Sequence, residues 1–151
     1  MKIGERIVHI ISGIKIFIFK HRTLFLRLPL IVVIISLWFL SSQSRLLRLP
    51  GFIGRDKIAH TIAYCGLAIT LSLWFPIEKW RSRRFLTICS VILISTLYGI
   101  IDELHQFFTP GRDSSILDLF ADTAGATIGA GLFLLFVEIF SKWSRIPKNS
   151  R

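Results

Sequence analysis

The sequence predicts an all-α membrane protein: a bundle of four transmembrane helices, preceded by an N-terminal amphipathic helix at the membrane interface. Three observations predict this fold class. The chain of 151 residues is 52% hydrophobic and 13% aromatic, and its mean hydropathy is +0.62. Its apolar residues gather in long blocks, close to the roughly 20 residues that a helix needs to cross a bilayer. Its formal net charge of +10 is concentrated between these blocks.

The chain divides into three regions along its length. Residues 1–28 are basic, and their isoleucines recur at helical spacing around polar residues. Because the apolar run 7–19 is too short to span a bilayer comfortably, we expect an amphipathic helix in the inner interface. Residues 24–140 are expected to form the four-helix transmembrane domain, and residues 141–151 a basic cytoplasmic tail.

Four segments are long and apolar enough to be predicted as spans. Pro29 is tolerated near the start of the first span. Asp56 stands just before the second span, where its side chain can cap the helix, and Pro76 ends that span. Because helices satisfy their backbone hydrogen bonds internally, several spans without a soluble domain predict a compact helical bundle in lipid. The predicted spans cover residues 24–41, 58–75, 85–107 and 116–140.

The orientation follows from the positive charges. Most of the nineteen Lys and Arg residues lie in segments 1–28 and 76–84 and in the tail from residue 141 onward. Cytoplasmic segments carry the excess of Lys and Arg in membrane proteins. We therefore expect both termini in the cytoplasm, and the loops after the first and third spans on the outer face.

Polar residues occupy the predicted outer end of the second span. Asp56, His60 and Tyr64 are spaced four residues apart and therefore share one face of the helix. Lys57 follows Asp56 directly. Carboxylates in or beside membrane-length apolar segments are costly, and by default they indicate a functional site.

The third span carries a similar row at its outer end. Tyr98, Asp102 and Gln106 follow at four-residue spacing, and Glu103 is three residues from Gln106 and can join them. His105 points away from this row, so we assign it no role. The polar layer of the second span therefore continues on the third.

The fourth span completes the layer. Asp118 and Asp122 are four residues apart, and the same face continues through Gly125 and Gly129, a small-xxx-small pattern that favours close helix packing. The turn before this span supplies Arg112, whose planar guanidinium suits carboxylates and phosphates. Three helices are thus expected to turn polar groups inward at one depth.

Structural roles compete with functional ones for several of these residues. Asp56 can simply cap its helix, and His60 can be a packing histidine whose hydrogen bonds are satisfied. Asp102 or Asp118 can pair with Arg112 to hold two helices together. The sequence leaves these alternatives open.

These residues also carry a resemblance. The patterns Asp56-Lys57-x-x-His60-x-x-x-Tyr64, then Tyr98-x-x-x-Asp102-Glu103-x-x-Gln106-x-Phe108-x-Pro110-x-Arg112, then Asp118 with Gly125 and Gly129, resemble the VanZ-like family. The resemblance covers residues 56–131 and implies a multi-pass protein of the bacterial inner (plasma) membrane. The founding member of the family is associated with resistance to the lipoglycopeptide teicoplanin. The family usually has Asn where this chain has Asp122, which can also bond across helices.

The first functional hypothesis is a VanZ-like envelope protein with an outward-facing polar site for an anionic lipid-linked substrate. Lys57, His60 and Arg112 would hold a phosphate, and Asp102 or Glu103 would act as a base assisted by His60. The candidate catalytic residues are Asp102, Glu103 and His60. The candidate substrate-binding residues are Asp56, Lys57, Tyr64, Tyr98, Gln106, Arg112 and Asp118.

Two other functions compete with this one. The polar cluster can instead lock the bundle of a non-enzymatic accessory or structural subunit, whose surface binds lipid or a membrane protein partner. A divalent-metal site has suitable ligands, but no two-histidine or cysteine motif supports it, so we assign no metal and no cofactor. The sequence carries no nucleic-acid-binding motif, and it does not decide whether the chain is an enzyme. The metal ligands considered were Asp56, His60, Asp102, Glu103 and Asp118.

Overall fold

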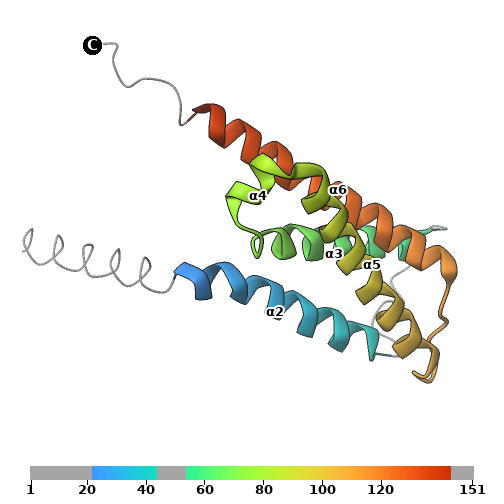
Figure 1. Ribbon diagram of the computed structural model, residues 1–151. Coiled ribbons are helices and arrows are strands. Elements are labelled where there is room, and N and C mark those ends of the chain that lie inside the picture. Colours follow the sequence, from blue (N-terminus) through green and yellow to red (C-terminus); the bar gives the residue numbers. More distant parts are fainter. Residues whose placement is uncertain (1–21, 44–53, 144–151) are drawn as a thin grey trace, which may run out of the picture.

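The computed structural model describes residues 22–43 and 54–143, and this part of the chain contains helices and no strands (Figure 1). Residues 1–21 of the predicted N-terminal segment 1–28, the segment 44–53 and the tail from residue 144 lie outside the described residues, and residues 22–28 of that segment belong to a longer helix. The described helices are α2 (Arg22–Ser41), α3 (Arg55–Ser72), α4 (Ile77–Ser82), α5 (Arg84–Phe107) and α6 (Ile116–Trp143).

The all-helical fold agrees with the prediction, but the number of spans differs. Among the described helices, α2, α5 and α6 are long and apolar enough to cross a membrane. The predicted second span corresponds to α3, which is not apolar enough to be counted among these candidate spans. Its 18 residues begin with Arg55, Asp56 and Lys57, and these charges lower the apolarity of a helix that has no length to spare. The structure therefore provides three candidate spans where four were predicted.

The basic connector before the third span contains a short helix that the sequence analysis did not predict. Pro76 precedes α4, and its carbonyl accepts a hydrogen bond from the backbone N–H of Lys79 at 2.9 Å. The indole of Trp80 is 1% exposed and donates to the Ser72 carbonyl at 3.3 Å. This contact anchors α4 against the end of α3.

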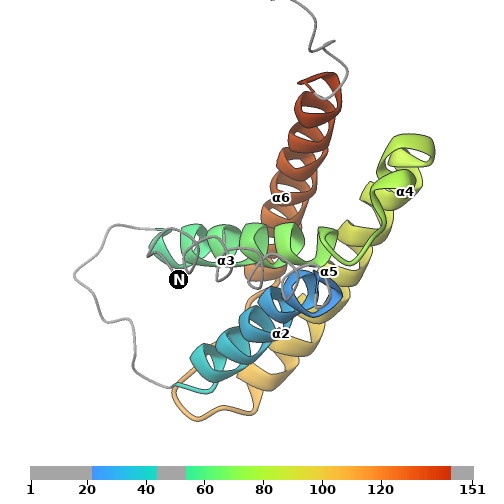
Figure 2. The same ribbon diagram turned by 90° about the vertical axis from the view of Figure 1, so that its left-hand side faces the viewer.

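Helix α3 lies across α6, as Figure 2 shows, and the two backbones approach closely. A Cβ added at Gly125 would lie 2.2 Å from the carbonyl oxygen of Thr61, and one added at Gly129 would lie 2.4 Å from that of Cys65. Only glycine fits at either position. The close packing predicted from the small-xxx-small pattern is therefore confirmed.

Large apolar side chains cover much of the outer surface of the helices. Ile35, Phe85 and Ile139 are 62%, 79% and 68% exposed. Extended apolar surfaces of this kind mark contact with membrane or with other proteins. The buried interior combines large side chains, such as those of Tyr64 and Trp80, with small ones, such as those of Ala68, Ala126 and Ala130.

The C-terminal ends of α2 and α5 and the N-terminal ends of α3 and α6 meet at the right-hand side of Figure 1. The hydroxyl of Ser42, just after α2, lies 2.9 Å from Nε2 of His105 on α5. Lys57 on α3 forms an ion pair with Asp118 on α6. The first contact joins α2 to α5, and the second joins α3 to α6. The polar residues predicted for one depth thus gather at one end of the fold.

Candidate functional site

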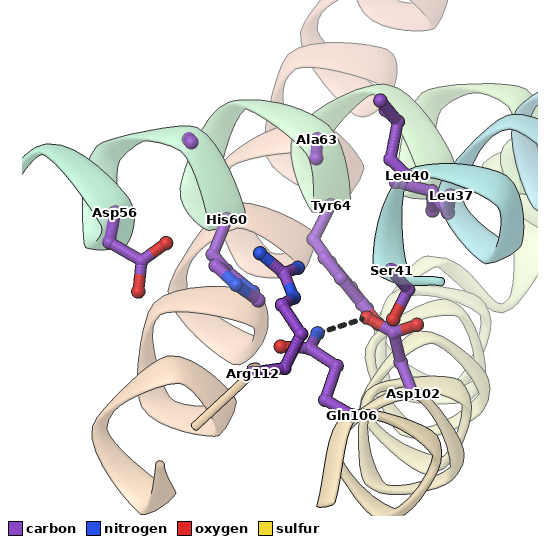
Figure 3. A pocket seen from close by; sticks show the side chains of 11 residues that line it. Leu37, Leu40, Ser41, Asp56, His60, Ala63, Tyr64, Asp102, Gln106 and Arg112 are labelled. Carbon is purple, nitrogen blue, oxygen red and sulfur yellow. Dashed lines mark hydrogen bonds between the residues drawn. The ribbon is translucent and has the colours of Figure 1, made fainter. Parts of the chain in front are cut away.

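A cavity of about 110 Å³ opens at this polar end, between α2, α3, α5 and the loop before α6 (Figure 3). Its walls are of two kinds. Leu37, Leu40, Ala59 and Ala63 provide an apolar wall from α2 and α3. The polar lining consists of Ser41, Asp56, His60, Tyr64, Asp102, Gln106 and Arg112.

Four polar atoms in this lining are buried and have no hydrogen-bond partner among the described residues. Buried polar groups in folded proteins are usually paired, so each exception calls for an explanation such as a bound ligand or water. Hydroxyl and guanidinium N–H groups can donate hydrogen bonds, and three of the four atoms are of this kind. The atoms are Ser41 Oγ, Tyr64 Oη, Asp102 Oδ1 and Arg112 Nε.

The side chains of Asp102 and Gln106 form one wall of the cavity. Gln106 Nε2 donates to Asp102 Oδ2 at 3.0 Å, one turn apart on α5, as the four-residue spacing predicts. This bond fixes the carboxylate and leaves Oδ1 unpartnered. Asp102 is 4% exposed. The cavity is therefore lined by a buried carboxylate together with Arg112.

The loop after α5 brings Arg112 to the cavity. Gly111 has a φ of 80°, a left-handed conformation that favours glycine, and the Arg112 N–H donates to the Thr109 carbonyl at 3.1 Å. Figure 3 shows the guanidinium reaching between His60 and Tyr64. No ion pair joins Arg112 to a carboxylate in the described ranges. The alternative in which Arg112 pairs with Asp102 or Asp118 is therefore not what the structure contains.

Lys57 and Asp118 lie outside the cavity lining and pair with each other. Asp118 is 2% exposed, and Lys57 Nζ also lies 3.7 Å from Asp56. Lys57 stands in the charged first turn of α3, where its ammonium group donates a hydrogen bond to Asp118. The pair joins α3 to α6, and it directs Lys57 away from the phosphate-binding position that the sequence suggested.

His60 connects the cavity to a second polar group between α3, α5 and α6. Its Nδ1 lies 2.8 Å from Oδ1 of Asp122, which is 0% exposed. Glu103 accepts a hydrogen bond from the backbone N–H of Ser115 at 2.8 Å through Oε2, which ties α5 to the start of α6. His60, Glu103 and Asp122 each place a ligand-type atom within 4.8 Å of the other two.

Tyr98 and His105 hold α5 against α2. The Tyr98 hydroxyl donates to the Ile34 carbonyl at 3.1 Å, so Tyr98, a predicted substrate-binding residue, uses its hydroxyl within the fold. His105 stacks on Trp38, with ring centroids 4.0 Å apart. The structure thus gives His105 a contact between helices that sequence analysis did not assign.

The sequence analysis missed Ser41 and one neighbour of Asp122. Ser41 looked like the end of an apolar span, and only its neighbours in space show that it lines the cavity. Asp122 bonds across helices to His60, as expected, but the sequence did not predict that Glu103 lies close to both. The four-residue spacing of Asp118 and Asp122 places both carboxylates on the face of α6 that packs against α3.

The described part of the chain is all-helical, with three helices long and apolar enough to cross a membrane and a cavity of unpartnered polar groups where the helix ends meet. Comparison with known protein families then places it more narrowly. Residues 15–137 match the VanZ/LLP1 family, a stretch that begins before α2 and ends within α6. The chain belongs to this family, which confirms the resemblance seen in its motifs. No curated protein and no solved structure matches the chain.

Proposed function

We propose that this protein binds the anionic headgroup of a membrane lipid or lipid-linked intermediate in the cavity beside Arg112. The observation that carries the proposal is the set of unpartnered donors on Ser41, Tyr64 and Arg112, all of which line one cavity. A phosphate has oxygens enough to accept from all three, and a guanidinium binds it with particular strength. The phosphate oxygens would thus supply the hydrogen-bond acceptors that these three donors lack.

The apolar wall supports a lipid over a water-soluble phosphate. Leu37 and Leu40 on α2 face Ala59 and Ala63 on α3 across the cavity lining. Ligand sites combine apolar walls with a few placed polar groups, and a lipid has both parts. Its acyl or prenyl chain would continue along α2 from Leu40, which lines the cavity and is 47% exposed.

Acid–base groups stand beside the proposed phosphate position. Asp102 and His60 line the cavity, whereas Glu103 lines a separate groove next to the start of α6. Among the predicted catalytic residues, Asp102 and His60 are therefore better placed to exchange a proton with a bound headgroup. Binding is the primary proposal, and a reaction would depend on it.

We further propose that α3 crosses the membrane together with α2, α5 and α6. At one end α3 lines the cavity together with the C-terminal end of α5, and at the other end the Trp80–Ser72 contact holds it against α4, which precedes α5. Its 18 residues extend about 27 Å at 1.5 Å per residue, slightly less than the bilayer core of about 30 Å. In the bacterial inner membrane, both termini would be cytoplasmic and the cavity would face outward, as the positive charges indicate.

Native mass spectrometry of gently purified protein tests the lipid proposal. We expect a stoichiometric phospholipid or polyprenyl-phosphate adduct on the wild-type chain, which Arg112→Ala loses. Arg84→Ala is the matched control, because Arg84 pairs with Glu138 at 3.4 Å on an exposed surface far along α5 from the cavity. Lipid retained equally by both variants would refute the proposal.

The alternative function is a non-enzymatic accessory subunit of a membrane complex. The same spectra distinguish it, since a stoichiometric protein partner without bound lipid would favour that function. The resemblance also suggests a link to teicoplanin-type resistance. Deleting the gene should then lower the teicoplanin concentration that stops growth, and a copy carrying Arg112→Ala should fail to restore it.

A further inference from the structure

We propose that His60, Glu103 and Asp122 bind a divalent transition-metal ion, in a site between the lipid cavity and the start of α6. This inference goes beyond the proposed lipid binding and does not depend on it. The three side chains come from α3, α5 and α6, and their ligand atoms lie within 4.8 Å of one another. Small side-chain movements would bring them to the bonds of about 2.0–2.2 Å that imidazole and carboxylate make to Zn²⁺.

The unpartnered atoms of this group are both acceptors, whereas the cavity has three unpartnered donors and one acceptor, Asp102 Oδ1. Glu103 Oε1 and Asp122 Oδ2 are buried and have no hydrogen-bond partner among the described residues. An ionised carboxylate accepts hydrogen bonds and cannot donate them, so these oxygens call for a cation or a donor. Two buried carboxylates near one imidazole leave negative charge without a fixed counter-charge, which a divalent cation would balance.

A second observation points to the same position. Asp122 Oδ2 and the ring edge of Tyr64 both face Gly99, where an added Cβ would lie 3.0 Å from the oxygen and 3.4 Å from Tyr64 Cε1. Tyr64 is 1% exposed, and its hydroxyl has no partner in the described part of the chain. The ring edge of Tyr64 thus borders the space beside the free carboxylate oxygen, while Tyr64 also lines the lipid cavity.

The surroundings orient the ligands as metal sites require. The backbone N–H of Ser115 donates to Glu103 Oε2 at 2.8 Å and leaves Oε1 for the ion. Such outer contacts fix the direction of metal-binding side chains. The ion also has routes of entry, because His60 lines the cavity and Glu103 lines a groove of about 460 Å³.

A second group that shares His60 is less suitable. Asp56, His60 and Asp118 also lie within 4.8 Å of one another. However, the ammonium of Lys57 already pairs with Asp118 and lies 3.7 Å from Asp56, and this fixed positive charge would repel a cation. No ion pair with Lys or Arg reaches Glu103 or Asp122 in the described ranges.

One imidazole with two carboxylates suits Zn²⁺ or Mn²⁺ better than Mg²⁺, which prefers oxygen ligands alone. The test uses the full chain, stripped with a chelator in detergent and titrated calorimetrically with ZnCl₂, MnCl₂ and MgCl₂. We expect one equivalent of Zn²⁺ or Mn²⁺, with weaker binding of Mg²⁺ and a higher melting temperature when the ion is bound. Absence of binding by all three ions would overturn the proposal.

Nearly isosteric variants locate the ion. Asp122→Asn and Glu103→Gln should each weaken binding by roughly tenfold or more, while Asp118→Asn and Asp56→Asn should leave it unchanged. The reverse pattern would move the ion to the second group and refute this assignment. If a variant unfolds, the visible spectrum of Co²⁺ added to the wild-type chain still tests whether a protein site binds the ion, since nitrogen and oxygen ligation is expected and the weak spectrum of the aquo ion would contradict the proposal.

Discussion

Nδ1 of His60 lies 2.8 Å from Oδ1 of Asp122, with the two side chains 11% and 0% exposed, and this contact joins α3 to α6 inside the fold. It separates two environments. On one side the cavity presents three unpartnered donors and the acceptor Asp102 Oδ1, and on the other side Glu103 and Asp122 present unpartnered acceptors. His60 therefore stands where a bound anion and a bound cation would be closest, and an effect of one ligand on the other would pass through its imidazole.

The close approach of α3 and α6 predicts that Gly125→Ala destabilises the fold. The new Cβ would lie 2.2 Å from the Thr61 carbonyl oxygen, so the helices must separate. Overpacking of this kind costs about 1–3 kcal/mol, more than the roughly 1 kcal/mol that alanine gains over glycine in a helix. Reversible unfolding in mixed micelles measures the change.

Gly131→Ala is the matched control on the same helix, because nothing lies within 4 Å of the position of its Cβ. We expect this variant to be as stable as the wild type or more stable, by up to about 1 kcal/mol. Equal stability of the two variants would show that α3 and α6 do not pack as described.

The Lys57–Asp118 ion pair predicts a measurable coupling between the two residues. Lys57→Met leaves the carboxylate of Asp118, which is 2% exposed, without its cation. Losing one partner of a fully buried pair costs about 3–5 kcal/mol, and we expect about 1–3 kcal/mol here because solvent reaches Lys57. The double variant Lys57→Met/Asp118→Leu should cost less than the sum of the two single changes.

The exposed pair of Arg84 and Glu138 serves as the comparison for this cycle. Its side chains are 68% and 44% exposed, so its coupling should stay below about 1 kcal/mol. A coupling at Lys57–Asp118 no larger than that of the exposed pair would mean that Lys57 does not neutralise Asp118 in the folded protein.

Stacking of His105 on Trp38 predicts that His105→Ala loosens α2 from α5. The change removes an aromatic contact with centroids 4.0 Å apart and the hydrogen bond to Ser42. Together these are worth about 1–3 kcal/mol. Leu104→Ala, at a neighbouring position that is 57% exposed, is the control, and a stability loss there as large as that of His105→Ala would contradict the assigned role.

The sequence predicted most of what depends on spacing along one helix. The rows Asp56–His60–Tyr64 and Asp102–Gln106 line one cavity because residues four apart share a helix face. Partnerships between helices were less predictable, since they depend on how the helices cross. Lys57 pairs with Asp118. The sequence offered several acidic residues as partners and did not indicate which of them Lys57 would contact.

The same reason explains the misjudged histidine. His105 does point away from the row of Asp102 and Gln106, as helical spacing requires, but the sequence did not reveal that α2 lies on that side. Its partners are Trp38 on α2 and Ser42 just after α2, both more than 60 residues earlier in the chain. Periodicity predicts which face a residue occupies, and it does not say what that face meets.

The position of α3 gives the last prediction, because its 18 residues and charged first turn leave its crossing of the membrane to be tested. In a chain whose native Cys65 and Cys89 are replaced by Ala, we would introduce Gln43→Cys, Ser82→Cys and Asp113→Cys one at a time. If α3 crosses, Gln43 and Ser82 lie on opposite faces.

A membrane-impermeant maleimide applied to spheroplasts should then label the cysteines at 43 and 113, and label that at 82 only after permeabilisation. Labelling of 43 and 82 from the same side would refute the crossing of α3. It would also contradict the described arrangement, because Ser42 contacts His105 near the end of α5, whereas Ser82 lies just before the start of α5.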